Sequence, residues 1–239
     1  MSRSTPSSTV ENYLKAIYML KQRTEGSLVV LGTLAEALGV TPGTVTTMVK
    51  NLADAGYADY ETRRGVSLTA KGEQAALHVL RRHRLVELFL VEVVGLDWSQ
   101  VHDDAEVLEH AISDTLLERI DEMLGHPTVD PHGDPIPAAS GKIQRRKLAP
   151  LADARPGQVE IARISDHAPD FLCFLRERGL TPGAKVTIVA RDDAAEVMTL
   201  QLDDKPPFAL GMSAAHKRRI AADPSATPGT VDVRTSRDL

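Results

Sequence analysis

The sequence contains a single cysteine and no long apolar run, and each shortage excludes a class of protein. The only cysteine among the 239 residues is Cys173. An intramolecular disulfide framework or a thiolate zinc site needs several sulfur atoms, so both are excluded. Because no stretch of about 18 apolar residues occurs, we expect neither a signal peptide nor a membrane-spanning helix. We therefore expect a soluble protein of the cytoplasm.

An excess of basic charge is also lacking. The formal net charge is -5 at pH 7, whereas a protein that coats nucleic acid regardless of sequence needs a strongly basic surface. Any basic patch must therefore be local. With 42% hydrophobic residues the chain can bury real cores, and its length suits up to three small domains.

The first third of the chain has the apolar pattern of three short helices. Apolar residues recur at helical period over Val10–Leu20, and a short helix is expected within Leu31–Val40. Thr41 is a favourable N-cap and Pro42 a favourable first residue for a third helix, which ends near residues 55–56. This order predicts a helix-turn-helix.

A short hairpin follows the third helix. Strands are expected at Tyr57–Tyr60 and Val66–Leu68, around a basic tip at residues 61–65. The third helix exposes small or hydroxyl-bearing side chains that can approach base edges, and the arginines of the tip can meet phosphates. The candidate DNA-binding residues are Thr41, Pro42, Gly43, Thr44, Thr46, Thr47, Lys50, Arg63 and Arg64. A winged helix that contacts only proteins is the alternative.

Six potential metal ligands follow in two clusters with helical spacing. His83 and Glu87 are four residues apart within an expected helix at Ala70–Val94, so they can converge on one face. A second helix is expected at Val101–Leu124. It carries the second cluster, His102, Glu106, Glu109 and His110. Two facing helices could hold a pair of metal ions, whereas the alternative for each cluster is a solvated helix face.

The second of these helices also carries an apolar stripe that needs a partner. A second copy of the chain is the simplest partner, because a two-fold dimer presents two recognition helices to a two-fold related DNA site. The stripe consists of Val107, Leu108, Ile112, Leu116, Leu117 and Ile120. In the preceding helix, we expect Arg81, Arg82 and Arg84 to add positive charge near the DNA-binding lobe.

The last third has the pattern of a small β-barrel. Short alternating strands are expected at Gln158–Ile164, Lys185–Ala190, Glu196–Leu202 and Phe208–Met212, with one helix at Asp170–Arg178.

Taken in order, these motifs resemble the diphtheria toxin repressor family, which includes the manganese transport regulators. The resemblance spans about Val10 to Ile220 and rests on the ordered ligand set and the His-Gly-Asp-Pro-Ile-Pro loop at residues 132–137. Residues 180–189 are similar to the FeoA-type, Src-homology-three-like domain that many members carry. The resemblance implies a homodimeric repressor that binds operator DNA when loaded with a divalent metal ion.

The resemblance also implies two metal sites. The regulatory site would consist of Asn12, Glu106, Glu109 and His110. The ancillary site would consist of His83, Glu87, His102, His167 and Asp170. Asn12 is a departure, because manganese-type members tend to have Asp there and iron-type members Met. Glu106 stands where iron-type members usually carry Cys, and such an oxygen-rich site favours Mn(II). Fe(II) is the alternative, and Co(II) or Zn(II) could substitute in vitro.

The patterns and the resemblance together divide the chain into four parts. We predict a winged helix-turn-helix DNA-binding domain at residues 1–72, a helical metal-binding and dimerisation domain at 73–146, a FeoA-type small β-barrel at 147–222 and a disordered tail at 223–239. The expected fold class is mainly α with small β elements.

The expected mechanism is that metal at the regulatory site ties the first helix to the dimer core, whereas without metal the clustered carboxylates repel one another. Two other function classes compete with this one. A winged-helix regulator could sense an organic ligand and bind DNA independently of metal. A metalloenzyme could use Glu87 or Glu106 as a base, but no nucleophile motif or substrate pocket is indicated, so we expect no enzyme.

Overall fold

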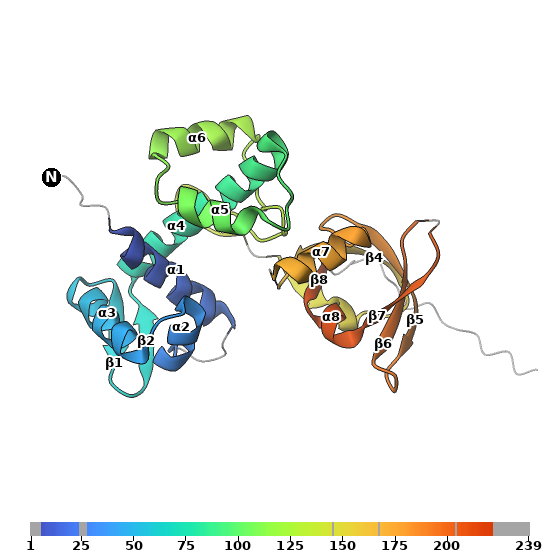
Figure 1. The fold of residues 1–239 in the computed structure, drawn as a ribbon, viewed down its shortest axis with the longest axis horizontal. Coiled ribbons are helices and arrows are strands. Elements are labelled where there is room, and N and C mark those ends of the chain that lie inside the picture. Colours follow the sequence, from blue (N-terminus) through green and yellow to red (C-terminus); the bar gives the residue numbers. More distant parts are fainter. Residues whose placement is uncertain (1–5, 24–27, 145, 167, 204, 222–239) are drawn as a thin grey trace, which may run out of the picture. The chain divides into compact units, whose positions relative to one another are not determined.

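The computed structural model describes residues 6–23, 28–144, 146–166, 168–203 and 205–221, and the chain divides into two compact units at residues 145 and 146 (Figure 1). The first unit is helical with one small hairpin, and the second combines an antiparallel sheet with short helices. The expected fold class is therefore confirmed. The predicted tail at 223–239 lies outside the described residues, and the proposed boundary between residues 72 and 73 stays a prediction.

The first unit begins with the predicted winged helix. Its elements are α1 (Ser8–Arg23), α2 (Leu31–Leu38), α3 (Pro42–Asp54), β1 (Ala58–Glu61) and β2 (Gly65–Leu68). The two strands pair in antiparallel register and form the wing. The turn between α2 and α3 is short, so the predicted helix-turn-helix is confirmed.

Local signals in the sequence explain this order of elements. Gly39 ends α2 in the left-handed region, at a φ of 63°. The Thr41 side chain accepts a hydrogen bond from a first-turn amide of α3, and Pro42 takes the first helical position. At the wing, Gly65 has a φ of 149°, and a Cβ there would lie 2.5 Å from the Val29 carbonyl oxygen. Only glycine allows the wing to pass so close to the segment before α2.

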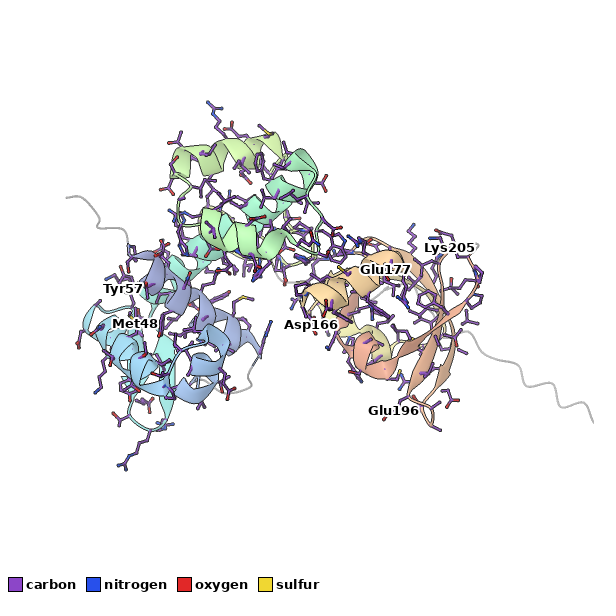
Figure 2. The ribbon with its side chains drawn as sticks, viewed as in Figure 1. Met48, Tyr57, Asp166, Glu177, Glu196 and Lys205 are labelled. Carbon is purple, nitrogen blue, oxygen red and sulfur yellow. The ribbon has the colours of Figure 1, made fainter. Side chains whose placement is uncertain are left out.

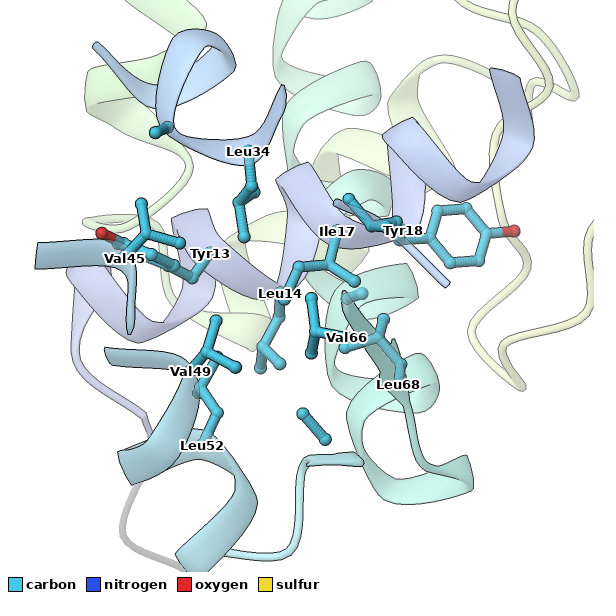
Figure 3. Packing of buried hydrophobic residues seen from close by; sticks show 14 of the residues in the cluster. Tyr13, Leu14, Ile17, Tyr18, Leu34, Val45, Val49, Leu52, Val66 and Leu68 are labelled. Carbon is cyan, nitrogen blue, oxygen red and sulfur yellow. The ribbon is translucent and has the colours of Figure 1, made fainter. Parts of the chain in front are cut away.

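One hydrophobic core holds these elements together. Leu14 and Ile17 of α1 are fully buried against Leu34 of α2 and against Val49 and Leu52 of α3 (Figure 3). These side chains recur at helical spacing, so the apolar period of the sequence becomes the inner face of each helix. The position of α3 therefore depends on that of α1.

The edge of this core also fixes the start of the next helix. Met48 and Tyr57 are partly buried and pack against the core from its edge (Figure 2). A Cβ at Gly72 would lie 1.9 Å from the Tyr57 carbonyl oxygen, so only glycine fits there. Thr69 caps the helix by accepting a hydrogen bond from the Gly72 amide at 3.2 Å. The long fourth helix thus docks tightly on the wing.

The long helix is confirmed over its predicted length. It consists of α4 (Ala70–Phe89) and one π-helical turn, η1 (Leu90–Val94), and Gly95 ends it with a φ of 81°. Within the described residues, none of the helices combines the length and apolar character that a bilayer crossing requires.

The single helix predicted at Val101–Leu124 is wrong, because the structure has two helices there. They are α5 (Val101–Leu108) and α6 (Asp114–Met123). Ser113 caps α6 by accepting a hydrogen bond from the Leu116 amide at 3.3 Å, and this cap competes with continued helix. Consequently, residues 109–112 form a turn instead of lying along a helix face.

The three arginines that were expected to add positive charge near the DNA-binding lobe are buried and paired with acceptors of the chain, so they offer no charge to DNA and that expectation is wrong. Arg81 donates a hydrogen bond to the Pro137 carbonyl at 2.9 Å, and Arg84 pairs with Asp130 at 3.4 Å. Arg82 pairs with carboxylates of α1 and α6. Buried cations need such partners. These side chains therefore hold the surrounding helices and the loop at residues 127–137 to α4.

The second unit is an antiparallel sheet with the strand order β3-β8-β4-β5-β6-β7. The strands are β3 (Leu148–Pro150), β4 (Gly157–Ile164), β5 (Lys185–Asp192), β6 (Val197–Gln201), β7 (Phe208–Gly211) and β8 (Arg218–Ala221). The helices are η2 (Leu151–Asp153), α7 (Pro169–Glu177) and α8 (Met212–His216). All four predicted strands and the predicted helix are present, whereas β3, β8 and α8 were not predicted. Within the described residues, β3 and β7 are the two edges and do not pair to close a barrel.

Candidate metal centre and DNA-binding surface

Three of the four predicted regulatory ligands lie together, where α1 meets the turn after α5. His110 Nε2 lies 2.7 Å from Asn12 Oδ1 and 3.3 Å from Glu109 Oε1. Glu109 is fully buried, with 0% exposure. Because α5 ends at Leu108, the side chains of Glu109 and His110 turn back towards α1. An imidazole nitrogen, a carboxylate oxygen and an amide oxygen form a donor set that suits a divalent transition metal.

Glu11, which was not predicted from the sequence, contacts the ring nitrogen of His110 that faces away from Asn12. Glu11 Oε2 lies 2.7 Å from His110 Nδ1, and Glu11 is itself buried and paired with Arg82. A carboxylate that accepts the Nδ1 proton fixes the orientation of the ring, so that Nε2 points towards Asn12 Oδ1 and Glu109 Oε1. The available signal was an acidic residue on the apolar face of α1, three residues before the buried Leu14.

The ancillary ligands from the first unit also lie together. Glu87 Oε1 is 3.0 Å from His83 Nε2 and 3.3 Å from His102 Nδ1. The two imidazole rings meet edge to face with centroids 4.9 Å apart. Thus α4 and α5 face each other, as the spacing predicted. Of the two further predicted ligands, Asp170 is exposed on α7 of the second unit, and His167 lies outside the described residues.

Glu106 lies with the ancillary ligands instead of with His110. Its carboxylate and the imidazoles of His83 and His102 offer donor atoms that all lie within 4.8 Å of one another. Glu109 reaches the same place, because its Oε2 is 2.6 Å from His83 Nδ1 while its Oε1 faces His110. The two predicted sites therefore form one continuous cluster that shares Glu106 and Glu109.

A lysine that was not predicted lies at the centre of this cluster. Lys15 Nζ is 2.7 Å from Glu106 Oε1 and 2.6 Å from Glu109 Oε1, and its side chain is only 11% exposed. Lys15 follows Glu11 by four residues and so lies on the same face of α1. The expectation that the carboxylates repel one another without metal is therefore wrong, because a cation of the chain lies between them.

The charges of the cluster are coupled. Burial favours the neutral form of His83, but hydrogen bonds to Glu109 and Glu87 outweigh it and raise the pKa of His83 to about 9. Burial opposes ionisation of Glu87, but hydrogen bonds from His102 and His83 lower its pKa below the usual range. The pKa of Glu106 is lowered in the same way, against burial, by Lys15. At pH 7 a metal ion would therefore have to displace a proton from His83.

The loop that supported the family resemblance braces Glu87. The buried carboxylate of Asp130 accepts hydrogen bonds from the backbone amides of His132 and Asp134, both at 2.9 Å. Burial, with the neighbouring charges of Asp134 and Glu87, raises the pKa of Asp130 to about 7. The donor atoms of Glu87, Asp130 and His132 lie within 4.8 Å of one another. The loop thus encloses the inner end of the cluster.

The candidate DNA-binding residues form the exposed face of α3 and the tip of the wing. All are exposed except Thr46, which is half-buried. The hydroxyls of Thr46 and Thr47 donate to the Pro42 and Gly43 carbonyls at 2.8 and 3.1 Å. Because these donors are used within the helix, the two threonines offer methyl groups and oxygen lone pairs for base contacts.

The wing arginines differ from each other. Arg63 lies at the tip in the left-handed region, with a φ of 63°, and its side chain is exposed. Arg64 is also exposed, but its guanidinium pairs with Glu61 of the same hairpin. Arg64 would have to exchange this carboxylate for a phosphate, and the two anions are similar in geometry.

Three family models match the chain. Residues 6–66 match the iron-dependent repressor N-terminal DNA-binding domain, residues 69–138 match the iron-dependent repressor metal-binding and dimerisation domain, and residues 149–217 match the FeoA domain. These matches fall on the winged helix, the helical cluster and the C-terminal sheet.

Curated relatives and solved structures agree with the models. The iron-dependent repressor IdeR of Mycobacterium leprae is 33% identical over 195 residues, which cover 75% of this chain and 83% of the relative. The diphtheria toxin repressor of Corynebacterium diphtheriae is 30% identical over 195 residues, covering 77% and 85%. A manganese-dependent transcriptional repressor in complex with manganese has a TM-score of 0.80 and 38% identity over 89% of this chain and 99% of that chain. The chain belongs to the diphtheria toxin repressor family of metal-dependent transcriptional repressors.

Proposed function

We propose that the protein is a homodimeric transcriptional repressor that binds operator DNA when loaded with Mn(II), with Fe(II) as the alternative metal. The observation that supports this proposal is the position of α1. This helix packs against α2, β2 and α4, and it also brings Asn12 to Glu109 and His110. One helix thus belongs both to the DNA-binding core and to the candidate metal site.

The geometry indicates how the residues would act. An ion held by Asn12, Glu109 and His110 would supply a bond between α1 and the end of α5. Glu11 holds the His110 ring in place, and the buried core fixes α3 relative to α1. The separation of two recognition helices in a dimer would then be set by the core. By linkage, operator DNA must raise the metal affinity by the same factor by which metal raises the DNA affinity.

We propose that a second copy of the chain covers the exposed apolar face of α5 and α6. Val107 is 72% exposed, Leu116 is 53% exposed and Met123 is 65% exposed. Leu117 and Ile120 of the predicted stripe are instead buried within the chain. Exposed apolar patches on soluble proteins mark interaction sites, and we assign these side chains to the contact between the two copies. A two-fold dimer formed through this face would match a two-fold related operator. We propose that the protein acts in the cytoplasm.

The donor chemistry favours Mn(II). Asn12 and Glu109 supply hard oxygen atoms and His110 supplies an imidazole nitrogen, while Glu106 adds a carboxylate beside His83 and His102. Hard oxygen donors suit Mn(II) better than softer metals, although raw affinity rises along the series towards Cu(II). We propose that Co(II) or Zn(II) can substitute in vitro, and the proposal gives no residue a catalytic role.

The test is operator affinity measured at controlled concentrations of free metal. The protein is first chelated, and binding to DNA from upstream of its own gene is followed by fluorescence anisotropy. Mn(II), Fe(II), Co(II) and Zn(II) are then added in separate titrations. We expect binding that appears only with metal, with Mn(II) active at a concentration available in cells. Equal affinity with and without metal would reject the proposal and favour a regulator that senses an organic ligand.

Glu11→Gln is expected to weaken Mn(II) binding about tenfold or more, because the neutral amide is a poorer acceptor for the His110 Nδ1 proton. Affinity is measured by competition with a chromophoric chelator. Glu36→Gln, which changes an exposed glutamate of α2, is the control and should leave the affinity unchanged. Equal affinities for the two variants would contradict the role of Glu11.

A further inference from the structure

We propose that Lys15 is a built-in competitor of the metal ion, a tethered cation that occupies the shared carboxylates and must withdraw before metal can bind them. The proposal rests on the proposed function of the cluster, and it adds that Lys15 sets the metal concentration at which the cluster binds its ion. The inference comes from the position of the ammonium group, which lies where the carboxylates of Glu106 and Glu109 converge.

The contacts of Lys15 are those of a bound cation. Its ammonium lies within 2.7 Å of one oxygen from Glu106 and one from Glu109. Lys15 is also nearer to Glu106 than the imidazoles are, since His83 Nδ1 and His102 Nε2 lie 3.8 and 3.7 Å from the same oxygen. Two short, charge-assisted hydrogen bonds must therefore be broken before these oxygens can be used elsewhere.

Charge balance explains why a cation is held there. Glu11 pairs with Arg82, and Glu87 receives hydrogen bonds from two histidines. Lys15 lies against the remaining pair of carboxylates, of which Glu109 also contacts His83, and Glu109 is fully buried, where a charge without enough compensation would be costly. The same pair can neutralise the lysine or bind a divalent ion, but one set of oxygens cannot fully serve both.

The side chain is also able to leave. A lysine ammonium is carried on a flexible four-carbon stem with rotatable donors, and the Lys15 side chain keeps 11% exposure, so it borders solvent. Withdrawal would therefore require rotamer changes without unfolding of α1. The metal concentration needed to load the site then depends on how much more strongly the carboxylates bind the metal ion than the lysine ammonium. That concentration is therefore sensitive to Lys15, which is not itself a ligand.

The first experiment compares Mn(II) affinities of the full chain by competition with a chromophoric chelator. Lys15→Met removes the charge and keeps a long unbranched side chain, and we expect Mn(II) to bind about tenfold tighter or more, because charged hydrogen bonds need not be broken. Lys15→Arg keeps the charge and should not bind more tightly than the original chain. Lys21→Met is the matched control, because Lys21 lies on the same helix and forms no ion pair with another described residue.

The second experiment needs no variant and therefore does not depend on folding of Lys15→Met. Acylation of lysine amines is followed by mass spectrometry in the chelated and Mn(II)-loaded protein. We expect the Lys15 amine to react faster after loading, because it leaves the carboxylates, while the rate for Lys21 stays unchanged. A rate for Lys15 that does not increase in the loaded protein would overturn the proposal.

The outcomes separate this inference from the proposed function. If metal activates DNA binding but Lys15→Met binds Mn(II) no more tightly, the competitor is rejected and the repressor function stands. If Lys15→Met binds more tightly but metal has no effect on DNA affinity, the competitor stands and the proposed function is rejected. A chain that binds no Mn(II) overturns both.

Discussion

Glu109→Gln is expected to remove the metal dependence of operator binding, with a loss of about 100-fold in affinity at saturating Mn(II). Glu109 is the carboxylate on which both parts of the cluster depend. One of its oxygens faces Lys15 and His110, and the other is 2.6 Å from His83. A neutral amide of the same shape keeps the packing but supplies a much weaker ligand, so α1 is no longer tied to the end of α5.

The measurement is fluorescence anisotropy with operator DNA, with and without buffered free Mn(II). Glu92→Gln is the control, because Glu92 is exposed in the π-helical turn and should leave activation intact. We also expect the melting temperature of chelated Glu109→Gln to fall, since Lys15 and His83 lose part of their charge compensation. Circular dichroism at the assay temperature checks that the variant is folded. Unchanged activation by Mn(II) would remove Glu109 from the regulatory site.

Local sequence signals predicted the winged helix and the convergence of His83 and Glu87 on one helix face. Gly39, Thr41 and Pro42 specify the turn between α2 and α3 through their own backbone preferences, which do not depend on distant residues. The spacing of His83 and Glu87 is likewise a property of one helix. The residues that interact in these signals are at most four positions apart, so the local structure can be predicted from one segment of the sequence.

The remaining features depend on which segments meet in space. The break between α5 and α6 arises from a serine cap that competes with continued helix, and periodicity alone does not reveal the outcome. Lys15 resembles any charged residue of an amphipathic helix until α1 packs against α5. Arg81 and Arg84 similarly look like surface charges, but they find acceptors in loops far along the chain. Partners that are distant in sequence decided the cases of Lys15, Arg81 and Arg84.

The same limitation explains the position of Glu106. Its spacing from Glu109 and His110 predicted one helix face, but α5 ends before those two residues, so they point elsewhere. Glu106 remains within the helix and faces His83 and His102. The structure therefore suggests a shared cluster in place of two separate sites, in which a change at one end alters the charge at the other.

Mn(II) affinity is expected to rise by up to about tenfold per pH unit between pH 7 and pH 9, because His83 must lose its proton to bind metal. The hydrogen bonds to Glu109 and Glu87 outweigh burial and raise the pKa of His83 from its ordinary 6.5 to about 9. In the chelated protein this protonation stabilises the fold fully below pH 6.5. That stabilisation is lost as the pH rises from 6.5 through 9, and the Mn(II) affinity increases over the same pH range.

Calorimetry under anaerobic conditions tests directly whether Mn(II) binding releases a proton and therefore strengthens as the pH rises. Titrations of Mn(II) in buffers of different ionisation enthalpy should show that about one proton is released per ion at pH 7. His83→Gln should flatten the pH dependence, whereas His126→Gln, which changes an exposed histidine, should retain it. An equally steep pH dependence in His83→Gln would assign the proton to another group. Because His83 contacts Glu109 through one nitrogen and Glu87 through the other, its proton links both halves of the cluster, so acid and Lys15 oppose the metal at the same carboxylates.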